Sequence, residues 1–505
     1  MDNEGLFPGC NFSPLAEKKK EKVKPRLRVI DRTQMVLHPV EIERLIPLDH
    51  EVRALWEFLG SLDLTSYHDH IESKEGKAGA PAFDPRLMIS IWLYSYSKGI
   101  NSAREVAKLT EYHPAYQWLT GMRPVNYHTL ADFRSSHGKS LSDLYTQTLA
   151  ILSYEGLITM ERVMHDGTKI KSFAGKKSFR SEKTLRKFLA EAKVQVKAME
   201  EASEEEVGLR RKKARERAAR ERKERLSHAL YELKKIIPRN KEKEERVSTT
   251  DPECRIMKQP GGGLDLSYNL QLSTDAHEKA IVALSLSPAA GDRALLEQAI
   301  EVMEETTGLP DQLVVDQGFI SRSNILAAAG KGIDLIGPVA QSSAGRVSAL
   351  NARQITEDFS PDKFLSVPER NGLICPKGKF LRFRGKQMKA GKTVYYYLGQ
   401  KCPTCPSKPS CCPKSTRGRI VSRTENDPRV TAFLEKMNTP HAKAVYKQRA
   451  EVAEFPNLWI KEKLGLRRFR LRGCVKAEME ARWACLTYNI KLWIRLCWTP
   501  RVQAQ

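Results

Sequence analysis

The segment ITMERVMHDGTKIKSF (158–173) decides the fold class, because the hydrophobic pattern changes there from helical to extended. Two alternating extended segments follow, LDLSYNLQLST (264–274) and KAIVALSLS (279–287), and a turn joins them. Helices and strands then alternate: a helix from Asp292 to about Thr307, the strand QLVVD ending at Asp316, the helix SRSNILAAAG (321–330) and the strand IDLIGPV (333–339). This order of elements predicts an α/β layer built on a mixed sheet.

The flanking segments divide the chain into further regions. In chain order we predict a basic arm over 1–40, a helical module over 41–158, the first part of the α/β core over 159–345, a Cys-rich insertion over 346–430 and C-terminal helices over 431–500. Within the core, residues 176–250 are rich in Arg, Lys and Glu with apolar residues at helical spacing, which predicts an antiparallel coiled coil of two long helices. Short helices with Gly and Pro breaks in the helical module are typical of a helix-turn-helix, and equally of a plain helical bundle.

The net charge of +24, from 85 Lys and Arg against 61 Asp and Glu in 505 residues, favours a polyanionic partner. The charge is concentrated in RRKKARERAARERKER (210–225) and KEKLGLRRFRLRG (461–473), so we expect a nucleic acid. For the first of these runs alone, a solvated helix face is the safer interpretation. No apolar run approaches the ~18–20 residues that span a bilayer, and MDNEGLFPGC (1–10) has no secretory pattern, so we expect a soluble protein inside the cell.

Four cysteines are candidate ligands of a structural zinc ion: Cys375, Cys402, Cys405 and Cys411. Cys402 and Cys405 have the spacing of a metal-binding elbow. Four thiolates would complete the tetrahedral shell of zinc and would staple a loop-rich segment that lacks a core of its own. The alternative is a group of idle reduced thiols, because Cys375 precedes Cys402 by 402 − 375 = 27 positions and a second Cys-x2-Cys pair is absent.

Asp166 and Asp316 are each expected at the end of a predicted strand. A single Asp near a glycine is a common turn, but two at strand ends of one sheet could share a hard cation in the crevice at its edge. Phosphodiester cleavage requires such an arrangement, because two Mg²⁺ ions ~3.5–4 Å apart activate the attacking oxygen and stabilise the leaving one. The pair therefore predicts a metal-dependent phosphoryl-transfer site.

The helix YKQRAEVAEFPNLWIK (446–461) offers a third carboxylate, Glu454, to complete the shell of Mg²⁺. Tyr446, Arg449 and Lys461 on the same segment could contact phosphate, Arg through its planar fork of donors and Lys as a point charge. For any one of these residues alone, a surface ion pair is the simpler interpretation. Pro456 is expected to bend or interrupt the helix.

Together these segments resemble the DDE-type transposases of bacterial insertion sequences. The resemblance runs from about 40 to 497 and rests on DPRLMISIWLYSYSKGINSAREV with YHTLADFR, HDGTKI, TDPECRIMK, SYNLQLSTDAH, GDRALLEQ, VVDQGF, the cysteine segment, and the Y-x2-R…E-x6-K helix that leads to RRFRLRG. It implies an RNase H-like core with Asp166, Asp316 and Glu454 as a catalytic triad that holds two Mg²⁺ or Mn²⁺ ions. DNA would be contacted by the cations and the tyrosine around the triad: Tyr446, Arg449, Lys461, Arg467, Arg468 and Arg470.

The implied activity is binding of terminal inverted repeats, cleavage at those ends and joining of the freed 3′-hydroxyl to target DNA. A homodimer at the synapsed ends and association with a prokaryotic nucleoid in the cytoplasm are expected. The chain departs from the family at Asn457-Leu458, where a Phe-Gly pair is usual, and Glu454 follows Arg449 by five positions, which leaves Glu451 as a rival third carboxylate. A nuclease of the same fold that does not join ends, and a DNA-binding repressor or architectural protein without catalysis, are the alternative functions.

Overall fold

The computed structural model describes residues 32–33, 35, 39–71, 73, 81–201, 209–236, 245–339, 350–389, 392–424 and 427–504. The chain divides into two units, Met1–Glu41 and Ile42–Gln505. The basic arm predicted over 1–40 lies almost entirely outside the described residues. None of the described helices combines the length and the apolar character that a bilayer crossing demands.

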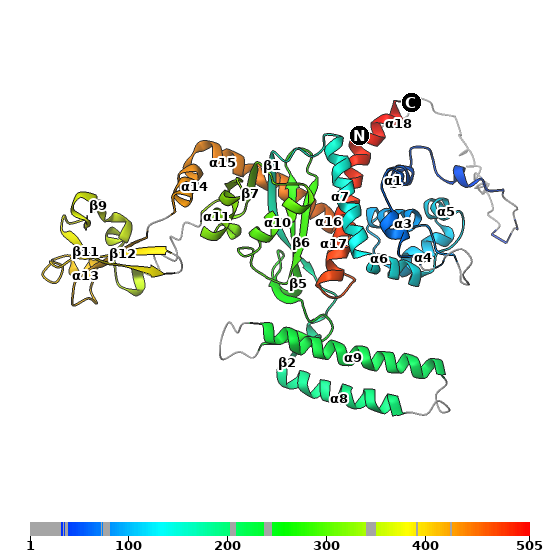
Figure 1. The fold of residues 1–505 in the computed structure, drawn as a ribbon, viewed down its shortest axis with the longest axis horizontal. Coiled ribbons are helices and arrows are strands. Elements are labelled where there is room, and N and C mark those ends of the chain that lie inside the picture. Colours follow the sequence, from blue (N-terminus) through cyan, green and yellow to red (C-terminus); the bar gives the residue numbers. More distant parts are fainter. Residues whose placement is uncertain are drawn as a thin grey trace, which may run out of the picture. The chain divides into compact units, whose positions relative to one another are not determined.

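The first part of the second unit is helical (Figure 1). Its helices are α1 (Glu51–Gly60), α2 (Thr65–His68), α3 (Pro85–Ser97), α4 (Ala103–Tyr112), α5 (Pro114–Thr120), α6 (Tyr127–Ser136) and α7 (Gly138–Tyr154). The start of α3 follows from its sequence, because Asp84 accepts a 2.7 Å hydrogen bond from the Arg86 backbone N–H and Pro85 occupies the first turn. Tyr145 of α7 donates a 2.6 Å hydrogen bond to the Ile281 carbonyl in the sheet, and the buried residues of the helices and the sheet form one continuous core.

A mixed sheet lies at the centre, as the sequence predicts. Its strands run in the spatial order β4–β5–β1–β7–β8, with β6 also paired to β5: β1 (Arg162–Lys171), β4 (Arg255–Lys258), β5 (Leu264–Asp275), β6 (Ile281–Ser287), β7 (Gln312–Val315) and β8 (Asp334–Ile336). Strands β1, β7 and β8 are parallel, whereas β5 pairs antiparallel with β1, β4 and β6. The helices between these strands are α10 (Leu296–Thr306) and α11 (Arg322–Gly330). The helix expected from Asp292 starts later, because the Asp292 side chain is hydrogen-bonded to Asn269 of β5 at 2.7 Å.

The prediction that Asp166 ends its strand is wrong. Asp166 lies inside β1, which continues to Lys171 because β5 pairs with it along that whole length. The parallel partner on the other side, β7, stops where Val315 pairs with His165. Asp166 is therefore the first residue of β1 beyond the end of β7, directly beside the point where Asp316 leaves the sheet.

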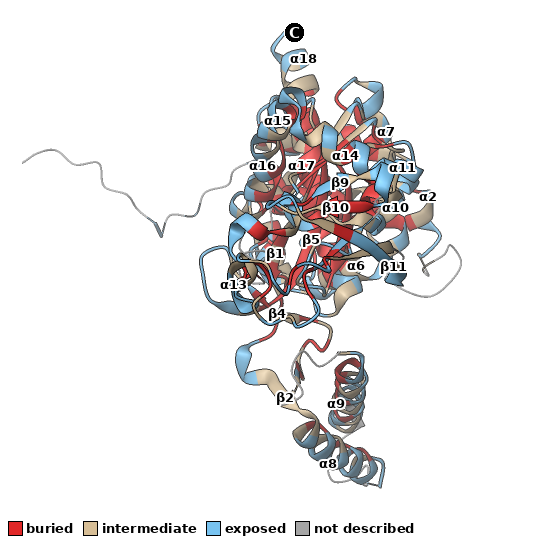
Figure 2. Ribbon diagram, turned by 90° about the vertical axis from the view of Figure 1, so that its left-hand side faces the viewer, coloured by how far each residue is buried: buried red, intermediate tan, exposed pale blue. Residues whose placement is uncertain are grey.

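The C-terminal helices cover the sheet and fill the core. They are α14 (Pro428–Asn438), α15 (Pro440–Lys447), α16 (Arg449–Glu462), α17 (Cys474–Trp493) and α18 (Thr499–Gln503). Figure 2 shows buried residues concentrated in β1, β5 and α17. Helix α16 packs on β1 and β5, and its Val452 and Ala453 belong to one hydrophobic cluster with Met164 of β1 and Val314 of β7. Pro456 lies inside α16 without interrupting it, and the break in the helical segment falls instead at Gln448, between α15 and α16.

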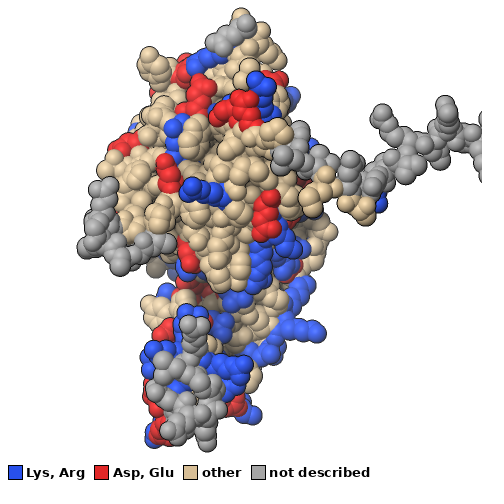
Figure 3. Space-filling view, turned by 90° about the vertical axis from the view of Figure 1, so that its right-hand side faces the viewer, with Lys and Arg blue, Asp and Glu red and all other residues tan. Residues whose placement is uncertain are grey.

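Between β1 and β4 the chain forms a two-helix arm, α8 (Glu182–Glu201) and α9 (Leu209–Lys235). Buried apolar side chains pack between the two helices: Leu185, Ala192, Leu226, Ala229 and Leu233. Strands β2 (Phe179–Ser181) and β3 (Arg246–Ser248), which the sequence pattern did not indicate, pair antiparallel at the base of the arm. In Figure 3 the lower part of the molecule carries Lys and Arg mixed with Asp and Glu, so the arm does not present a purely cationic face.

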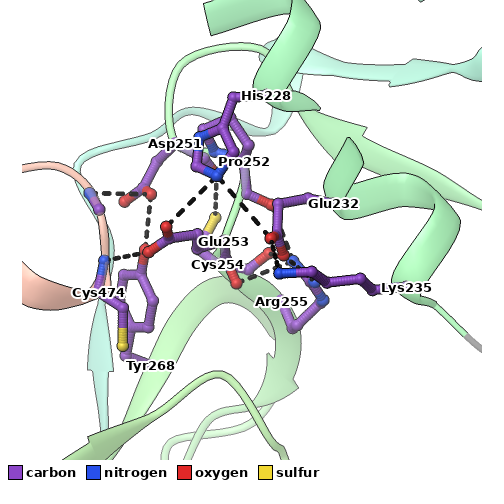
Figure 4. Close-up of polar contacts among 11 residues, drawn as sticks. His228, Glu232, Lys235, Asp251, Pro252, Glu253, Cys254, Arg255, Tyr268 and Cys474 are labelled. Atoms are coloured by element: carbon purple, nitrogen blue, oxygen red, sulfur yellow. Dashed lines mark hydrogen bonds and ion pairs between the residues drawn. The ribbon is translucent and has the colours of Figure 1, made fainter. Parts of the chain in front are cut away.

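A polar cluster fastens the arm to the sheet and to the start of α17 (Figure 4). Glu232 of α9 forms an ion pair of 3.0 Å with Arg255 of β4. Glu253 accepts a hydrogen bond from the Cys474 backbone N–H, and its other oxygen lies 3.5 Å from Nε2 of His228. Asp251, fully buried, accepts hydrogen bonds from the Tyr268 hydroxyl at 2.6 Å and from the Gly473 N–H at 3.2 Å. We call these residues the arm joint.

The Cys-rich insertion folds around a second sheet. Its strands run in the order β13–β12–β11–β10–β9: β9 (Leu365–Val367), β10 (Gly372–Ile374), β11 (Phe380–Lys389), β12 (Lys392–Leu398) and β13 (Ile420–Thr424), with the short helix α13 (Lys408–Cys411). Phe359, Phe364, Leu373, Leu381 and Val421 form a small hydrophobic core. The expectation of a loop-rich segment without its own core is therefore wrong.

Candidate active site

Asp166 and Asp316 face the C-terminal helices where β1 passes the end of β7. Arg449, the first residue of α16, places Nη1 3.5 Å from Oδ2 of Asp166. Tyr446 of α15 donates a 3.3 Å hydrogen bond to Oδ1 of Asp316. Each aspartate also accepts a backbone N–H, from Gly167 at 2.9 Å and from Gln317 at 2.7 Å, which fixes one oxygen of each carboxylate. The structure thus brings two predicted acids and two predicted phosphate contacts together.

Two further residues of α16 face the same stretch of β1. Lys461 donates a hydrogen bond to the hydroxyl of Thr168, and Nδ2 of Asn457 lies 3.5 Å from Oδ2 of Asp166. Sequence reasoning missed Asn457 and Thr168. Helical spacing was the available signal for Asn457. It follows Arg449 by eight positions and precedes Lys461 by four, and residues at such spacings lie on nearly the same face of a helix. Thr168 follows Asp166 by two positions in a strand, so both side chains point to one face of the sheet.

The site is held together by opposing electrostatic effects. Burial raises the pKa of Asp166, and the nearby carboxylates of Asp316 and Asp292 add to this, while Arg449 opposes it. The pKa of Arg449 is raised, because the two aspartates outweigh the cost of burying the guanidinium. Burial lowers the pKa of Lys461. A carboxylate whose burial is only partly offset by one cation is suited to bind a further positive charge.

Asp292 lies on the opposite face of the sheet from Asp166. It forms an ion pair of 3.2 Å with Lys169 and accepts hydrogen bonds from Asn269 and Gln271 of β5 at 2.7 and 3.3 Å. A Cβ atom at Gly167 would approach Oδ1 of Asp292 to 2.8 Å and Nε2 of Gln271 to 2.5 Å. A side chain at 167 would therefore push this network out of place, because it packs directly against the backbone beside Asp166.

The structure does not bring Glu454 to the two aspartates. Glu454 is exposed, and no hydrogen bond or ion pair joins it to Asp166 or Asp316. The rival acid, Glu451, has a side chain that is 77% exposed and pairs with Lys279 at 2.8 Å. Within the described ranges, no three side chains of His, Cys, Asp or Glu are grouped so that they could hold a metal ion. Two aspartates fit a hard divalent cation, and the expected third acid does not complete the group.

The predicted basic residues beyond α16 lie along the end of β1. Lys171, the last residue of β1, bridges to Arg468 in parallel, and its N–H donates a 3.2 Å hydrogen bond to the Arg467 carbonyl. Arg467 also pairs with Glu462, and Arg470 donates a 3.2 Å hydrogen bond to Asn101. All three arginines are exposed. The backbone at Arg467 and Arg468 thus pairs alongside the end of β1, which places exposed cations beside the end of the strand that holds Asp166.

The four cysteines predicted to bind zinc line one small cavity together with Cys412. Cys402, Cys411 and Cys412 are buried, whereas Cys375 and Cys405 are half-buried. Cys375 accepts a 3.2 Å hydrogen bond from the Lys379 N–H, and the Cys405 N–H donates to the Cys402 carbonyl at 3.1 Å. Burial raises the pKa of Cys411 to about 12. The thiols converge, but they do not stand at the spacing of a formed metal group, and Cys412 is a further thiol that the sequence interpretation did not include.

Two families match parts of the chain. Residues 40–136 match the family described as "Transposase domain (DUF772)", and residues 374–494 match the "Transposase DDE domain". The first match spans α1 to α6, and the second contains the cysteines, Tyr446, Arg449 and Glu454. None of the curated proteins matches the sequence. A solved structure titled "Cryo-EM structure of piggyBac transposase synaptic complex with hairpin DNA" aligns over 92% of this chain and 76% of its own, at 9% identity and a TM-score of 0.29.

Proposed function

Because these two matches make the chain a DDE-type transposase, we propose that it binds the terminal inverted repeats of its insertion sequence, cleaves DNA there and joins the 3′-hydroxyl ends to target DNA. The observation that carries the proposal is the convergence of Asp166 and Asp316 with Tyr446 and Arg449 where β1 passes the end of β7. We further propose that the mixed sheet and its helices are an RNase H-like core.

Asp166 and Asp316 would hold Mg²⁺ or Mn²⁺. Two such ions, when bound, activate the attacking oxygen and stabilise the leaving oxygen of an in-line displacement. Arg449 balances the charge of the two carboxylates, and Tyr446 orients Asp316. Lys461, held by Thr168, offers a cation to the phosphate beside Asp166. Glu454 stays a prediction, because it is exposed and bonded to neither aspartate.

Exposed Arg467, Arg468 and Arg470 would follow the DNA backbone away from the cleavage site, since cations at phosphates position a duplex without reading its sequence. Zinc bound by Cys375, Cys402, Cys405 and Cys411 would brace the insertion; the cavity they share supports this, and Cys412 competes for the fourth position. A homodimer would bring the two ends of the element together. The working location would be the nucleoid in the cytoplasm of a prokaryotic cell.

The test is Mg²⁺-dependent cleavage of a labelled duplex that carries the inverted repeats flanking the gene. Wild-type protein is expected to cleave and to form a strand-transfer product, whereas Asp316→Asn is expected to bind the duplex and to lose cleavage by roughly 1000-fold or more. The matched control is Asp334→Asn, because Asp334 lies on β8 of the same sheet but pairs with Lys436. Cleavage without joined product would identify a nuclease, and binding without cleavage by wild type would identify a DNA-binding protein without catalysis.

A further inference from the structure

The Cys-rich insertion contains a long run of sequence with cations and no acids. Residues 371–424 include eight lysines and five arginines, and neither aspartate nor glutamate occurs among them. The run contains β10 to β13, and β9 has no acid either, so the strands of this sheet cannot neutralise its cations. A surface that serves only solubility normally mixes both signs of charge. A segment with one sign favours a partner of the opposite charge.

Four of these cations are exposed along β11: Arg382, Arg384, Lys386 and Lys389. We call them the β11 cations. Strand β10 pairs with β11 only from Phe380 to Arg382, so in the described part of the sheet one edge of β11 is open beyond that point. Among the described residues, none of the four side chains forms an ion pair with an acid. Their charges are therefore available to a ligand.

The pairing of β11 with β12 distributes these cations over both faces of the sheet. The register shifts at Arg384, which forms a β-bulge. Lys386 lies opposite Tyr395, whereas Lys389 shares the other face with Tyr396 and lies 5.5 Å from the centre of its ring. At about 3.4 Å per residue, the β11 cations extend over roughly 20 Å. Since each strand of duplex DNA carries one phosphate per ~3.4 Å of its axis, several phosphates would lie within their reach.

The arm shows how cations of this chain are arranged where acids accompany them. Arg217 pairs with Glu221 at 3.8 Å, and Arg220 pairs with Glu200 at 3.2 Å, so acids of the arm already offset part of its charge. Charged side chains on an open strand edge also prevent pairing with another chain, but glutamate fills that role as well as lysine does. Protection of the edge therefore does not explain why β11, β12 and β13 contain no acid at all.

We propose that the β11 cations bind the phosphate backbone of duplex DNA without reading its sequence. Exposed lysines and arginines that have no acidic partner gain affinity by displacing the counterions condensed on DNA. Contacts to phosphates position a duplex but carry no information about its sequence. The β11 cations are distinct from the residues of the candidate active site, and their binding of DNA does not require cleavage. The inference thus goes beyond the proposed function and gives the chain a second DNA-binding surface.

The experiment measures binding of the full chain to a fluorescent duplex without the inverted repeats, by anisotropy at a series of salt concentrations. The test variant combines Arg382→Gln, Arg384→Gln, Lys386→Gln and Lys389→Gln. The matched control removes the same charge from ion pairs of the arm, by combining Arg186→Gln, Arg217→Gln, Arg220→Gln and Arg222→Gln. At ~0.9 per phosphate contact, the slope of log affinity against log salt should become shallower by about 3–4 in the test variant, and by less than about 1 in the control.

Three results would overturn the proposal: an unchanged slope in the test variant, an equal change in the control, or no binding of this duplex by wild type. Thermal melting checks that the variants are folded. If the combined variant unfolds, Lys386→Gln alone decides, because it alters one exposed side chain and should reduce the slope by about 1.

Cleavage of a duplex that carries the inverted repeats is measured separately, so that failure of this inference differs from failure of the proposed function. A wild type that cleaves, together with an unchanged slope in the test variant, would refute the DNA-binding surface on β11 and leave the proposed function standing. A wild type that does not cleave, together with a shallower slope in the test variant, would refute the proposed function and leave this surface standing.

Discussion

The arm joint and the candidate active site are both clusters of acids in the same chain, but their burial and hydrogen bonding differ. Asp251 is fully buried, whereas Asp166 and Asp316 are half-buried. At the joint, groups on other elements donate to Asp251 at 2.6 and 3.2 Å, and Arg255 reaches Glu232 at 3.0 Å (Figure 4). At the candidate site, the contacts from α15 and α16 to the two aspartates are 3.3 to 3.5 Å. Closely matched donors hold a carboxylate in one structure, whereas long contacts leave its oxygens able to take another partner.

The largest expected difference between the clusters is in cleavage. Asp166→Asn should reduce Mg²⁺-dependent cleavage by roughly 1000-fold, because it removes a charged metal ligand. Asp251→Asn should leave cleavage within about threefold of wild type, since an amide oxygen can still accept from Tyr268 and Gly473. Cleavage rates on the same duplex, with DNA binding measured in parallel, check both. If the two folded variants lost cleavage activity equally, Asp251 would be needed for cleavage as much as Asp166, and the proposed difference between the two clusters would be wrong.

The next effect concerns the shape of the cation at the site. Arg449→Lys keeps the charge beside Asp166 but loses the planar fork that can serve Asp166 and a phosphate together, so cleavage should fall about 10- to 100-fold. Its control, Arg429→Lys, alters an exposed pair with Asp427 and should cleave as wild type. Single-turnover cleavage at saturating DNA measures the effect apart from binding. An unchanged rate in Arg449→Lys would mean that only the charge is used.

The sequence predicted the sheet well because its strands are strongly patterned. β5 and β6 are buried almost throughout, and β7 is a short apolar run, so each stands out from its neighbours. The position of Asp166 within β1 was not predictable, because the end of a strand depends on how far each partner continues. The sheet of the Cys-rich insertion escaped notice because β11 (FLRFRGKQMK) is mostly exposed and charged and shows no alternation of apolar residues.

One part of the candidate site could likewise be predicted from the sequence, and another part could not. Asp166 and Asp316 were predictable, since adjacent strands bring them together whatever the helices do. The direction in which the third acid points was not, because the helical segment breaks at Gln448, and packing of Val452 and Ala453 sets the face that α16 presents to the sheet. Spacing along the sequence favoured Glu454, which is exposed on α16, whereas Asn457 is the residue of α16 that is buried beside Asp166.

A smaller effect should appear in stability. Tyr268→Phe removes the 2.6 Å donor to the fully buried Asp251 and should lower the free energy of unfolding by about 1–3 kcal/mol, seen as a melting temperature lower by a few degrees. Tyr446→Phe is the matched change at the candidate site. Its hydroxyl makes a 3.3 Å contact with a less buried acid, so melting should hardly change. A larger loss in Tyr446→Phe would reverse the assignment of structural and functional roles.

The smallest effect is the pH dependence of the arm joint. Burial raises the pKa of Asp251 above its ordinary 3.8, so the folded protein keeps that proton to a higher pH than the unfolded chain does. The stability that protonated Asp251 contributes is thus fully present below about pH 3.8 and is lost as the pH rises through its folded pKa. The amide in Asp251→Asn does not titrate. The melting temperature of the variant minus that of wild type should therefore increase by about one or two degrees as the pH rises from 4 to 7. A constant difference across this range, in melting curves followed by circular dichroism, would mean that Asp251 is ionised throughout and that Tyr268 and Gly473 already offset its burial.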